Sequence, residues 1–281
     1  MTATAKTRIT AMKAAALEPA GEASGPGAPA GDPNFMTSLA RGLTVIQAFS
    51  QARRSLSISQ ISQKTGIPRA AVRRCLYTLE LLGFVAVDSG RQFTLRPRIL
   101  LLGHPYLAST PLAKAAEPVL RQLSQLLNES SSIAILDGDD ILYIARASTS
   151  RIMTIDLDIG SRLPANCTSM GRVLLSRLDS AELERRLASV KLVQHTAHTL
   201  GTVEALREEL HQVRKQGFAV IDQELELGLR SIAVPILDSS GKAVAAINIG
   251  IHAARASVHD MIRRFLPVLK DAAEELSLLA R

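Results

Sequence analysis

Three short helices are predicted close together near the start of the chain, and they constrain its fold more than any other feature. Apolar residues recur at helical spacing over residues 37–50. Ser57 is suited to cap a second helix, which Gly66 ends. Pro68 has a backbone angle already set for a first helical residue, and it opens a third helix predicted to run to Gly83. Amphipathic helices joined by so short a turn are typical of a helix-turn-helix.

The third helix is predicted to have two unlike faces. One face is apolar and is expected to be buried: it carries Val72, Cys75, Leu76, Leu79 and Leu82. The opposite face carries Arg69, Ala70, Arg73 and Arg74. Such a helix can dock on a core with one side and meet the phosphates and base edges of DNA with the other. Charged residues also form ordinary solvated helix faces, so the pattern needs support from elsewhere in the chain.

A predicted hairpin supplies part of that support. Strands are expected at 84–87 and 92–95, joined by an Asp-Ser-Gly-Arg turn. Three helices followed by a hairpin form the pattern of a winged helix-turn-helix, which we assign to residues 35–96.

Three further residues are candidates for DNA contact. Arg91, at the tip of the wing, is placed to reach the DNA backbone or the minor groove. Lys64 and Thr65 lie at the turn between the second and third helices, where phosphates would approach.

The formal net charge of +7 is concentrated in one part of the 281-residue chain. Residues 35–110 carry +8, residues 1–34 are neutral and residues 111–281 carry −1. A focused basic block is typical of a polyanion-binding surface, most often one for nucleic acid. The sequence therefore predicts double-stranded DNA as a partner, and leaves open which arginine reads bases and which holds phosphate.

The rest of the chain divides into three parts. Residues 1–34 are rich in Gly, Pro and Ala and are predicted to be a disordered tail. Residues 97–110 are predicted to form an apolar linker helix. Residues 111–281 mix helices with hairpins, which favours an α/β domain with an antiparallel sheet and places the whole chain in the α+β class.

Several details of this last part are also predicted. A turn at 137–140 separates two strands, and a third strand is expected at 153–157. Ser257 and Asp260 have the spacing of a capping box at the start of the C-terminal helix. Pro267 is expected to kink that helix.

Composition argues against several classes of protein. No stretch approaches the roughly 18 uninterrupted apolar residues of a membrane span. Cys75 and Cys167 lie in different predicted domains, which makes a disulfide scaffold unexpected and a reducing cytoplasm the expected location. The first residues contain no apolar signal segment, although their lack of acids leaves a transit peptide as a minor alternative.

Sequence signals for an enzyme are weak. The chain has no nucleophile elbow, phosphate-binding loop or dinucleotide fingerprint, and we expect no catalytic residue, cofactor or metal. Cys167 with His195 or His198 could form a nucleophile pair, but no orienting acid is recognisable. The alternative class is a small-molecule enzyme or sensor that carries a vestigial helix-turn-helix.

Four segments carry a resemblance to a known family. The chain resembles the IclR family of bacterial transcription regulators over about 37–280, most specifically at residues 38–43, 61–68, 160–172 and 217–235. Residues 68–76 and 222–231 resemble one branch in particular, which regulates the pca and pob genes of the protocatechuate and β-ketoadipate pathway. Members of this branch are usually activators.

The resemblance implies a homodimer or tetramer on DNA and a GAF-like C-terminal domain that binds a small organic acid. The effector contacts carried over residue by residue are Ser169, Met170, Ile221, Ser231, Asn248 and Gly250. A helix that begins near Ser169 is also physically suited to a carboxylate, because its free N–H groups and dipole favour an anion.

The chain departs from relatives that bind glyoxylate or pyruvate. Those relatives have Asp, Cys and two Ser where this chain has Ile221, Ser231, Asn248 and Gly250. The change suits a larger or differently polar effector, and protocatechuate, 4-hydroxybenzoate and β-ketoadipate remain open. Arg151 and Arg230 are weaker candidates for the effector carboxylate, since structural ion pairs would also explain them. With aromatics at only 3% of the chain, the pocket is expected to hold its acid by N–H groups and polar side chains.

Overall fold

The computed structural model describes residues 32–50, 53–148 and 157–280. Contacts divide the chain into two compact units, one ending at Tyr106 and the other beginning at Leu107. Nearly all of the tail predicted at 1–34, and all but Leu157 of the strand predicted at 153–157, lie outside the described residues.

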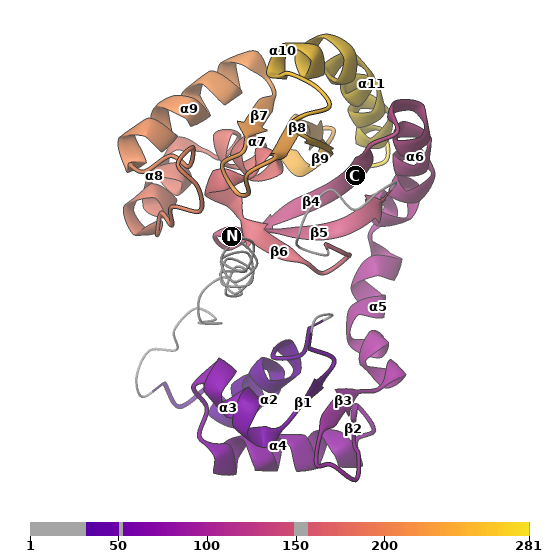
Figure 1. The fold of residues 1–281 in the computed structure, drawn as a ribbon, viewed down its shortest axis with the longest axis vertical. Helices are drawn as coiled ribbons and strands as arrows, with labels where there is room; N and C mark the ends of the chain where they lie inside the picture. Colours follow the sequence, from indigo (N-terminus) through magenta and orange to yellow (C-terminus); the bar gives the residue numbers. More distant parts are fainter. Residues whose placement is uncertain (1–31, 51–52, 149–156, 281) are drawn as a thin grey trace, which may run out of the picture. The chain divides into compact units, whose positions relative to one another are not determined.

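Before the linker, the described residues of the first unit form three helices and a small sheet (Figure 1). The helices are α2 (Thr37–Gln47), α3 (Ile58–Thr65) and α4 (Arg69–Leu81). The strands β1 (Ser55–Leu56), β2 (Val85–Val87) and β3 (Phe93–Leu95) pair antiparallel in the order β1-β3-β2. This is the predicted winged helix-turn-helix with one extra strand, β1, which is too short to show a period of its own in the sequence.

The turn between α3 and α4 is built from local signals. Ser57 and Gln60 form a capping box at the start of α3, and Gly66 ends it in the left-handed region at φ 70°. Pro68 is the N-cap of α4 and not its first residue, because its ψ of 140° is extended. These features hold α3 and α4 close together. The two helices share the hydrophobic core of this unit, which includes Ile61, Val72 and Leu76.

Two burial predictions for α4 were wrong. Leu82 is 51% exposed and Cys75 is only half-buried, whereas Val72, Leu76 and Leu79 are buried as predicted. The helix ends at Leu81, and Leu82 is its C-cap, just before the left-handed Gly83.

A linker follows the wing. It consists of a 3₁₀ turn at Pro97–Ile99 and helix α5 (Leu100–Ser109), close to the helix predicted at 97–110. The division between the two units falls within α5.

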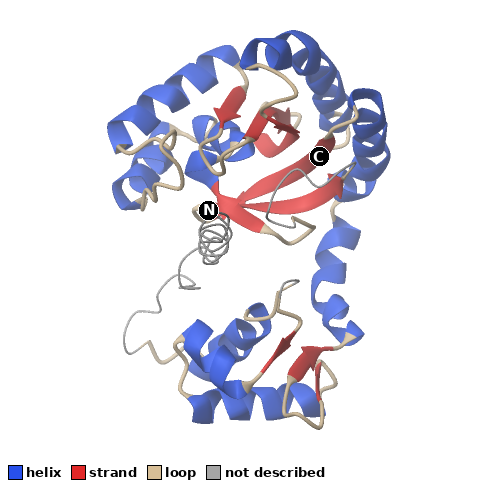
Figure 2. Ribbon diagram, in the orientation of Figure 1, coloured by secondary structure: helices blue, strands red, loops and turns tan. Residues whose placement is uncertain are grey.

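The second unit is a six-stranded antiparallel sheet covered by helices (Figure 2). The strands run in the order β6-β5-β4-β9-β8-β7: β4 (Ser130–Asp137), β5 (Asp140–Ala147), β6 (Arg162–Pro164), β7 (Ala219–Asp222), β8 (Leu229–Leu237) and β9 (Ala243–His252). The helices are α6 (Pro111–Leu127), α7 (Ser169–Ser176), α8 (Ser180–Ser189), α9 (Val203–Gln216), α10 (Val258–Asp260) and α11 (Leu266–Ser277). The predicted α+β class with an antiparallel sheet is confirmed. Strand β6 was missed, and Leu157 is not in a strand.

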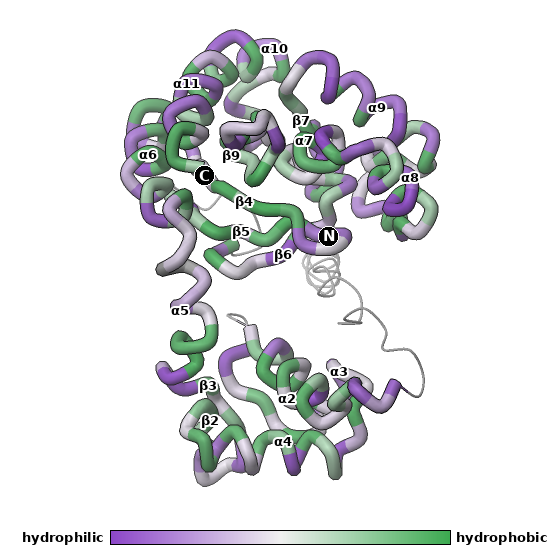
Figure 3. Tube along the Cα trace, turned by 180° about the vertical axis from the view of Figure 1, so that it is seen from behind, coloured by the Kyte–Doolittle hydropathy of each residue, from purple (hydrophilic) through white to green (hydrophobic). Residues whose placement is uncertain are grey.

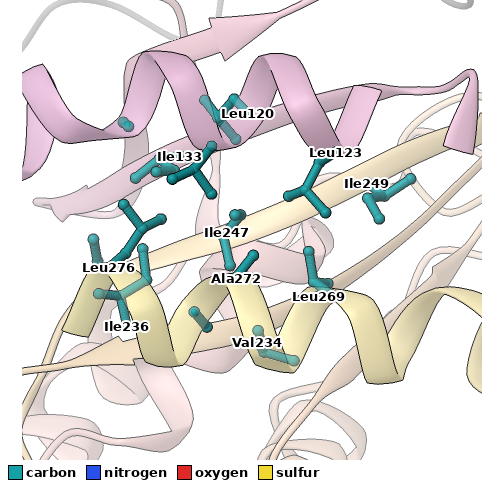
Figure 4. Close-up of a cluster of buried hydrophobic side chains, with 14 of the residues drawn as sticks. Leu120, Leu123, Ile133, Val234, Ile236, Ile247, Ile249, Leu269, Ala272 and Leu276 are labelled. Atoms are coloured by element: carbon teal, nitrogen blue, oxygen red, sulfur yellow. The ribbon is translucent and has the colours of Figure 1, made fainter. Parts of the chain in front are cut away.

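The sheet is buried on both faces, which explains the hydrophobic strands visible in Figure 3. On one face, Ile133, Ile247 and Ile249 pack against Leu120 of α6 and Leu269 of α11 (Figure 4). The other face packs against α7 and α9 through a separate cluster that includes Ala134, Ala246 and Met170.

The C-terminal helix begins as predicted and deviates before its proline. Ser257 and Asp260 form the expected capping box. Met261–Phe265 is a π-helical turn, and Pro267 stands in the first turn of α11. Because Pro267 has no N–H to donate into the preceding turn, a break in the α-helical hydrogen bonds is expected here.

Candidate functional site

The exposed face of α4 is cationic in the structure. Arg69, Ala70, Arg73 and Arg74 are all exposed, while Val72 and Leu76 on the opposite side are buried. None of these three arginines forms an ion pair with another residue that the structure describes. Their guanidinium groups therefore stand in solvent on one side of the helix, as direct contact with DNA requires.

The other three candidates for DNA contact are placed differently. Arg91 is exposed in the turn between β2 and β3, in the left-handed region at φ 57°. The Lys64 ammonium donates a hydrogen bond to the Ala48 carbonyl (2.6 Å), and burial lowers the Lys64 pKa, with repulsion from Arg53 adding to the effect. The Thr65 hydroxyl donates to the Ile61 carbonyl. Lys64 and Thr65 thus already have partners within the unit, which favours a structural role for them.

A cavity lies between the sheet and α7 in the second unit. It comprises about 530 Å³ of space between atoms, part of it open to solvent. Five of the six residues predicted to contact an effector line it: Ser169, Ile221, Ser231, Asn248 and Gly250. The sixth, Met170, is buried in the core beneath α7. Their role in binding stays a prediction, but strands far apart in sequence bring four of them, Ile221, Ser231, Asn248 and Gly250, to one wall, and Ser169 comes from α7.

Strand register explains why these residues share a wall. Ser130 of β4 pairs with Gly250 of β9, which pairs with Ser231 of β8, and Ser231 pairs with Ile221 of β7. Residues directly opposite in neighbouring strands point to the same face of a sheet. These four side-chain positions therefore form one row across the sheet.

A second row runs parallel to the first, two residues along β4 and β9. Asn248 pairs with Ser132 of β4, and Ser132 pairs with Arg146 of β5. The Arg146 guanidinium donates a long hydrogen bond (3.3 Å) to the Ser132 hydroxyl, and it forms no ion pair with any described residue. The cavity wall thus contains a cation without a counter-charge among those residues.

Three polar atoms of the cavity lining lack partners. The Ser130 hydroxyl, the Ser169 hydroxyl and the Asn248 side-chain oxygen are buried without a hydrogen-bond partner among the described residues. A buried polar atom without a partner costs about 1–3 kcal/mol. Because all three line one cavity, a polar ligand there would remove that cost.

Helix α7 presents its first turn to the cavity. Thr168 is the N-cap, and its side-chain oxygen accepts a hydrogen bond from the Gly171 N–H. The Ser169 and Met170 N–H groups precede the first intrahelical hydrogen bond, which the Arg172 N–H makes to the Thr168 carbonyl. Free N–H groups at a helix start attract an anion.

A buried ion pair holds this helix start in place. Arg172 is 2% exposed, and it donates two hydrogen bonds to the Glu224 carboxylate (2.8 and 2.6 Å) and one to the Asn166 carbonyl (3.0 Å). Glu224 lies in the segment before Leu225, which also lines the cavity. The pair therefore ties α7 to the segment between β7 and β8 behind the cavity wall.

Gly171 allows α7 to approach the turn before it. A Cβ added to Gly171 would overlap the backbone of Ala165, which has no freedom to move away cheaply. We expect Gly171→Ala to lower the free energy of unfolding by about 1–3 kcal/mol, as overpacking does. Urea denaturation measures this, with Gly201→Ala as the control because nothing lies within 4 Å of a Cβ there. An unchanged midpoint for Gly171→Ala would contradict the argument.

Sequence reasoning missed Ser130, Ser132, Tyr143 and Arg146 as parts of the cavity wall. The alternation of Ser130 and Ser132 along a strand was a signal, since polar residues two apart share one face. No pattern in the sequence distinguished Arg146 from the many other arginines. Only the register of β4 with β5 brings it to the cavity.

The weaker candidates have structural roles. Arg230 donates to both oxygens of Asp222 (2.6 and 3.2 Å) and to two backbone carbonyls, and it holds the pKa of Asp222 below its usual range. Burial raises the pKa of Cys167 to about 12, so its thiol stays protonated and is a poor nucleophile. Arg151 lies outside the described residues.

The described residues contain neither a membrane-spanning helix nor a cluster of metal ligands. None of their helices is both long and apolar enough to cross a membrane. No group of three His, Cys, Asp or Glu side chains within 32–50, 53–148 and 157–280 is arranged to hold a metal ion.

Comparison with known proteins agrees with both units. Residues 38–89 match the IclR helix-turn-helix domain, and residues 104–278 match the domain described as bacterial transcriptional regulator IclR C-terminal. The chain is 53% identical over 247 residues to the Pca regulon regulatory protein of Pseudomonas putida, a match that covers 88% of this chain and 84% of that protein.

Two solved structures are also similar. RHA06195 from Rhodococcus sp. RHA1 is 44% identical with a TM-score of 0.76, covering 88% of this chain and 98% of that one. A double mutant of the PobR inducer-binding domain from Acinetobacter, in complex with 3-hydroxybenzoic acid, is 31% identical with a TM-score of 0.56, covering 59% of this chain and 97% of that one. With its two domains matched in order and a close relative over most of its length, the chain belongs to the IclR family of bacterial transcriptional regulators.

Proposed function

We propose that this regulator binds operator DNA through α4 and the wing, and that a small organic acid in the cavity of the second unit changes this binding. The genes it controls are those of aromatic-acid catabolism of the pca type, which it activates from the cytoplasm. The observation that carries the proposal is the cavity itself, where, among the described residues, Arg146 has no ion-pair partner and three polar atoms have no hydrogen-bond partner. A cation and orphaned polar groups together favour a small polar anion.

Two relatives support the proposal that this chain regulates aromatic-acid catabolism. A regulator of the Pseudomonas putida Pca regulon is 53% identical to this chain, and the PobR inducer-binding domain holds 3-hydroxybenzoic acid. The second unit of this chain has the corresponding fold, and its cavity is lined by residues of the sheet and of α7.

Self-association is part of the proposal. Helix α2 exposes Leu39 and Leu43, at 58% and 48%, one turn apart on the same side, and α5 exposes Leu100, Leu101 and Leu102. Exposed large apolar side chains that gather in this way are typical of interaction surfaces. A homodimer or tetramer would cover them and would match two half-sites of an operator.

The test is DNA binding by the full chain, measured by fluorescence anisotropy on the intergenic DNA beside its own gene. We expect affinity to fall steeply with salt, by a log–log slope of about −0.9 for each phosphate contacted. Protocatechuate, 4-hydroxybenzoate or β-ketoadipate should shift the binding curve or the footprint, whereas glyoxylate should not. Acid binding measured by calorimetry should depend much less on salt, because residues 111–281 are close to neutral.

The result that would contradict the proposal is DNA binding unaffected by every acid of the panel, together with no heat of binding for any of them. A reporter gene under the same promoter tests the direction of control. Activation predicts that deleting the regulator lowers acid-induced expression, whereas repression predicts high expression without acid.

A further inference from the structure

Three consecutive serines at the start of β4 are divided between the two faces of the sheet. Ser130 and Ser132 line the cavity, and Ser131 between them faces the layer of α6 and α11, since successive residues of a strand alternate between faces. Ser131 pairs with Ile249, which belongs to the hydrophobic cluster beneath those two helices. One short segment of β4 therefore presents hydroxyls to the cavity on one side and a hydroxyl to α6 on the other.

Ser131 forms a buried hydrogen-bonded pair with Ser124 of α6, called the serine pair below. The two side-chain oxygens are 2.9 Å apart, and the residues are 0% and 3% exposed. The Ser131 hydroxyl donates to the Leu120 carbonyl (2.9 Å). Because each hydroxyl has one proton, the Ser124 hydroxyl is left to donate to the Ser131 oxygen or to the Ala147 carbonyl (3.2 Å). The serine pair thus connects α6 to both β4 and β5.

Strand β5 has the same division between faces. The Arg146 side chain lines the cavity, and the carbonyl of the next residue, Ala147, accepts from Ser124. Ala147 also pairs directly with Ser131 across the two strands. The same two strand segments therefore hold polar groups of the cavity wall and both sheet contacts of Ser124.

The serine pair differs in kind from the rest of the contact between α6 and the sheet. Apart from Ser124, every buried residue of α6 is apolar, and Leu120 belongs to the same cluster as Ile133 of β4 (Figure 4). Among the described residues, the hydrogen bonds between α6 and the sheet are those of the serine pair. Apolar contacts are not directional, whereas a hydrogen bond weakens steeply when its angle changes. The serine pair therefore makes the position of α6 depend on the position of β4 and β5.

Helix α6 is connected almost directly to the linker helix. Helix α5 ends at Ser109 and α6 begins at Pro111, so that one residue separates them. A displacement of α6 against the sheet is therefore passed along the chain to α5, which follows the wing of the DNA-binding unit.

We propose that the serine pair is the contact through which an acid in the cavity acts on α6 and so on DNA binding. The inference rests on the proposed function, since it requires an acid in the cavity, but it does not depend on which acid binds. Ser124 and Ser131 are positioning residues, because neither lines the cavity. When the strands adjust around the acid, the serine pair makes α6 follow them; without it, only apolar contacts that can slide remain.

The test compares acid binding with the effect of the acid on DNA binding in the full chain. Calorimetry with protocatechuate, 4-hydroxybenzoate and β-ketoadipate measures the first, and fluorescence anisotropy on the intergenic DNA, with and without saturating acid, measures the second. In the wild type, acid should change DNA affinity by about fivefold or more, as coupled sites do. In Ser131→Ala and in Ser124→Ala, acid affinity should stay within about threefold of the wild type, while the change in DNA affinity falls below about twofold.

Each single variant is expected to fold. Ser124→Ala leaves the Ser131 hydroxyl bonded to the Leu120 carbonyl, and Ser131→Ala leaves the Ser124 hydroxyl bonded to the Ala147 carbonyl. Neither variant therefore buries a hydroxyl without a partner. The double variant should lose no more of the acid effect than either single variant, because all three remove the same contact. Ser124→Thr keeps the hydroxyl and should keep most of the acid effect.

Ser277→Ala is the matched control. The Ser277 hydroxyl of α11 accepts from the Leu237 N–H of β8 and donates to the Ala273 carbonyl. Its removal breaks a similar contact between a helix and the same sheet, but α11 does not lead into the linker. This variant should keep the full effect of acid on DNA affinity, and thermal melts compare its stability with that of the serine-pair variants.

Three outcomes would overturn the inference while the proposed function stands. The first is an equal effect of acid on DNA affinity in the wild type and in Ser131→Ala. The second is an equal loss in Ser277→Ala, because any weakened contact of the helical layer would then suffice. The third is a tenfold or greater loss of acid affinity in the serine-pair variants, which would give them a role in the cavity itself. If no acid changes DNA binding by the wild type, the proposed function and the inference both fail.

Discussion

Replacing Arg73 and Arg74 together by alanine should lower operator affinity by about 30-fold or more, since each arginine that reads a base contributes about 1–3 kcal/mol. Both side chains are exposed on α4 and unpaired within the described residues, so the structure has no other evident use for them. Fluorescence anisotropy at several salt concentrations measures the effect. If both arginines hold phosphates, the salt slope should also fall by nearly two.

The control for this double variant removes two positive charges from the second unit instead of from α4. Arg121→Ala with Arg185→Ala deletes two exposed arginines of the second unit that form surface ion pairs. Such pairs contribute little to stability, so this control should bind DNA almost as the wild type does. Lysine at positions 73 and 74 should restore phosphate contacts but not bidentate base contacts. Undiminished binding by the alanine double variant would remove α4 as the recognition helix.

Arg172→Met should lower the free energy of unfolding of the second unit by about 3–5 kcal/mol. The change leaves the Glu224 carboxylate, which is 7% exposed, without the guanidinium that neutralises it, and leaves the Asn166 carbonyl without its donor. Breaking one side of a buried ion pair costs more than removing both, because an uncompensated charge remains. Urea denaturation followed by circular dichroism measures the loss.

A double-mutant cycle tests the reason for this loss. Arg172→Met combined with Glu224→Gln removes both charges and should be more stable than Arg172→Met alone. The exposed pair of Arg207 and Glu184 is the matched control, and Arg207→Ala should cost less than about 1 kcal/mol. A cost of that size for Arg172→Met would show that the buried pair does not hold α7.

The winged helix-turn-helix could be predicted almost completely from local signals. The cap at Ser57, the left-handed Gly66 and the helical period of Val72, Leu76 and Leu79 are properties of short segments. They act between residues a few positions apart, so the sequence alone was sufficient to locate them. The exceptions lie at element ends: Pro68 is a cap and not the first helical residue, and Leu82 is exposed.

The cavity was less predictable, because its wall depends on pairing between distant strands. Five expected residues line it, but they came from resemblance to a family and not from a local pattern. Met170 shows the limit of that approach. It follows Ser169 directly, yet its side chain points into the core because successive helical residues face different directions.

By itself the sequence determined that a cationic helix-turn-helix is followed by a nearly neutral α/β domain, since charge and hydrophobic period can be read from each residue and its near neighbours. Only the tertiary structure decided which side chains line the cavity of the second unit. Arg146 lies in one row with Ser132 and Asn248 because three strands pair in one register, and a shift of one residue would turn it to the other face of the sheet. Likewise, Arg172 becomes a buried structural cation only because Glu224, 52 residues away, folds against it.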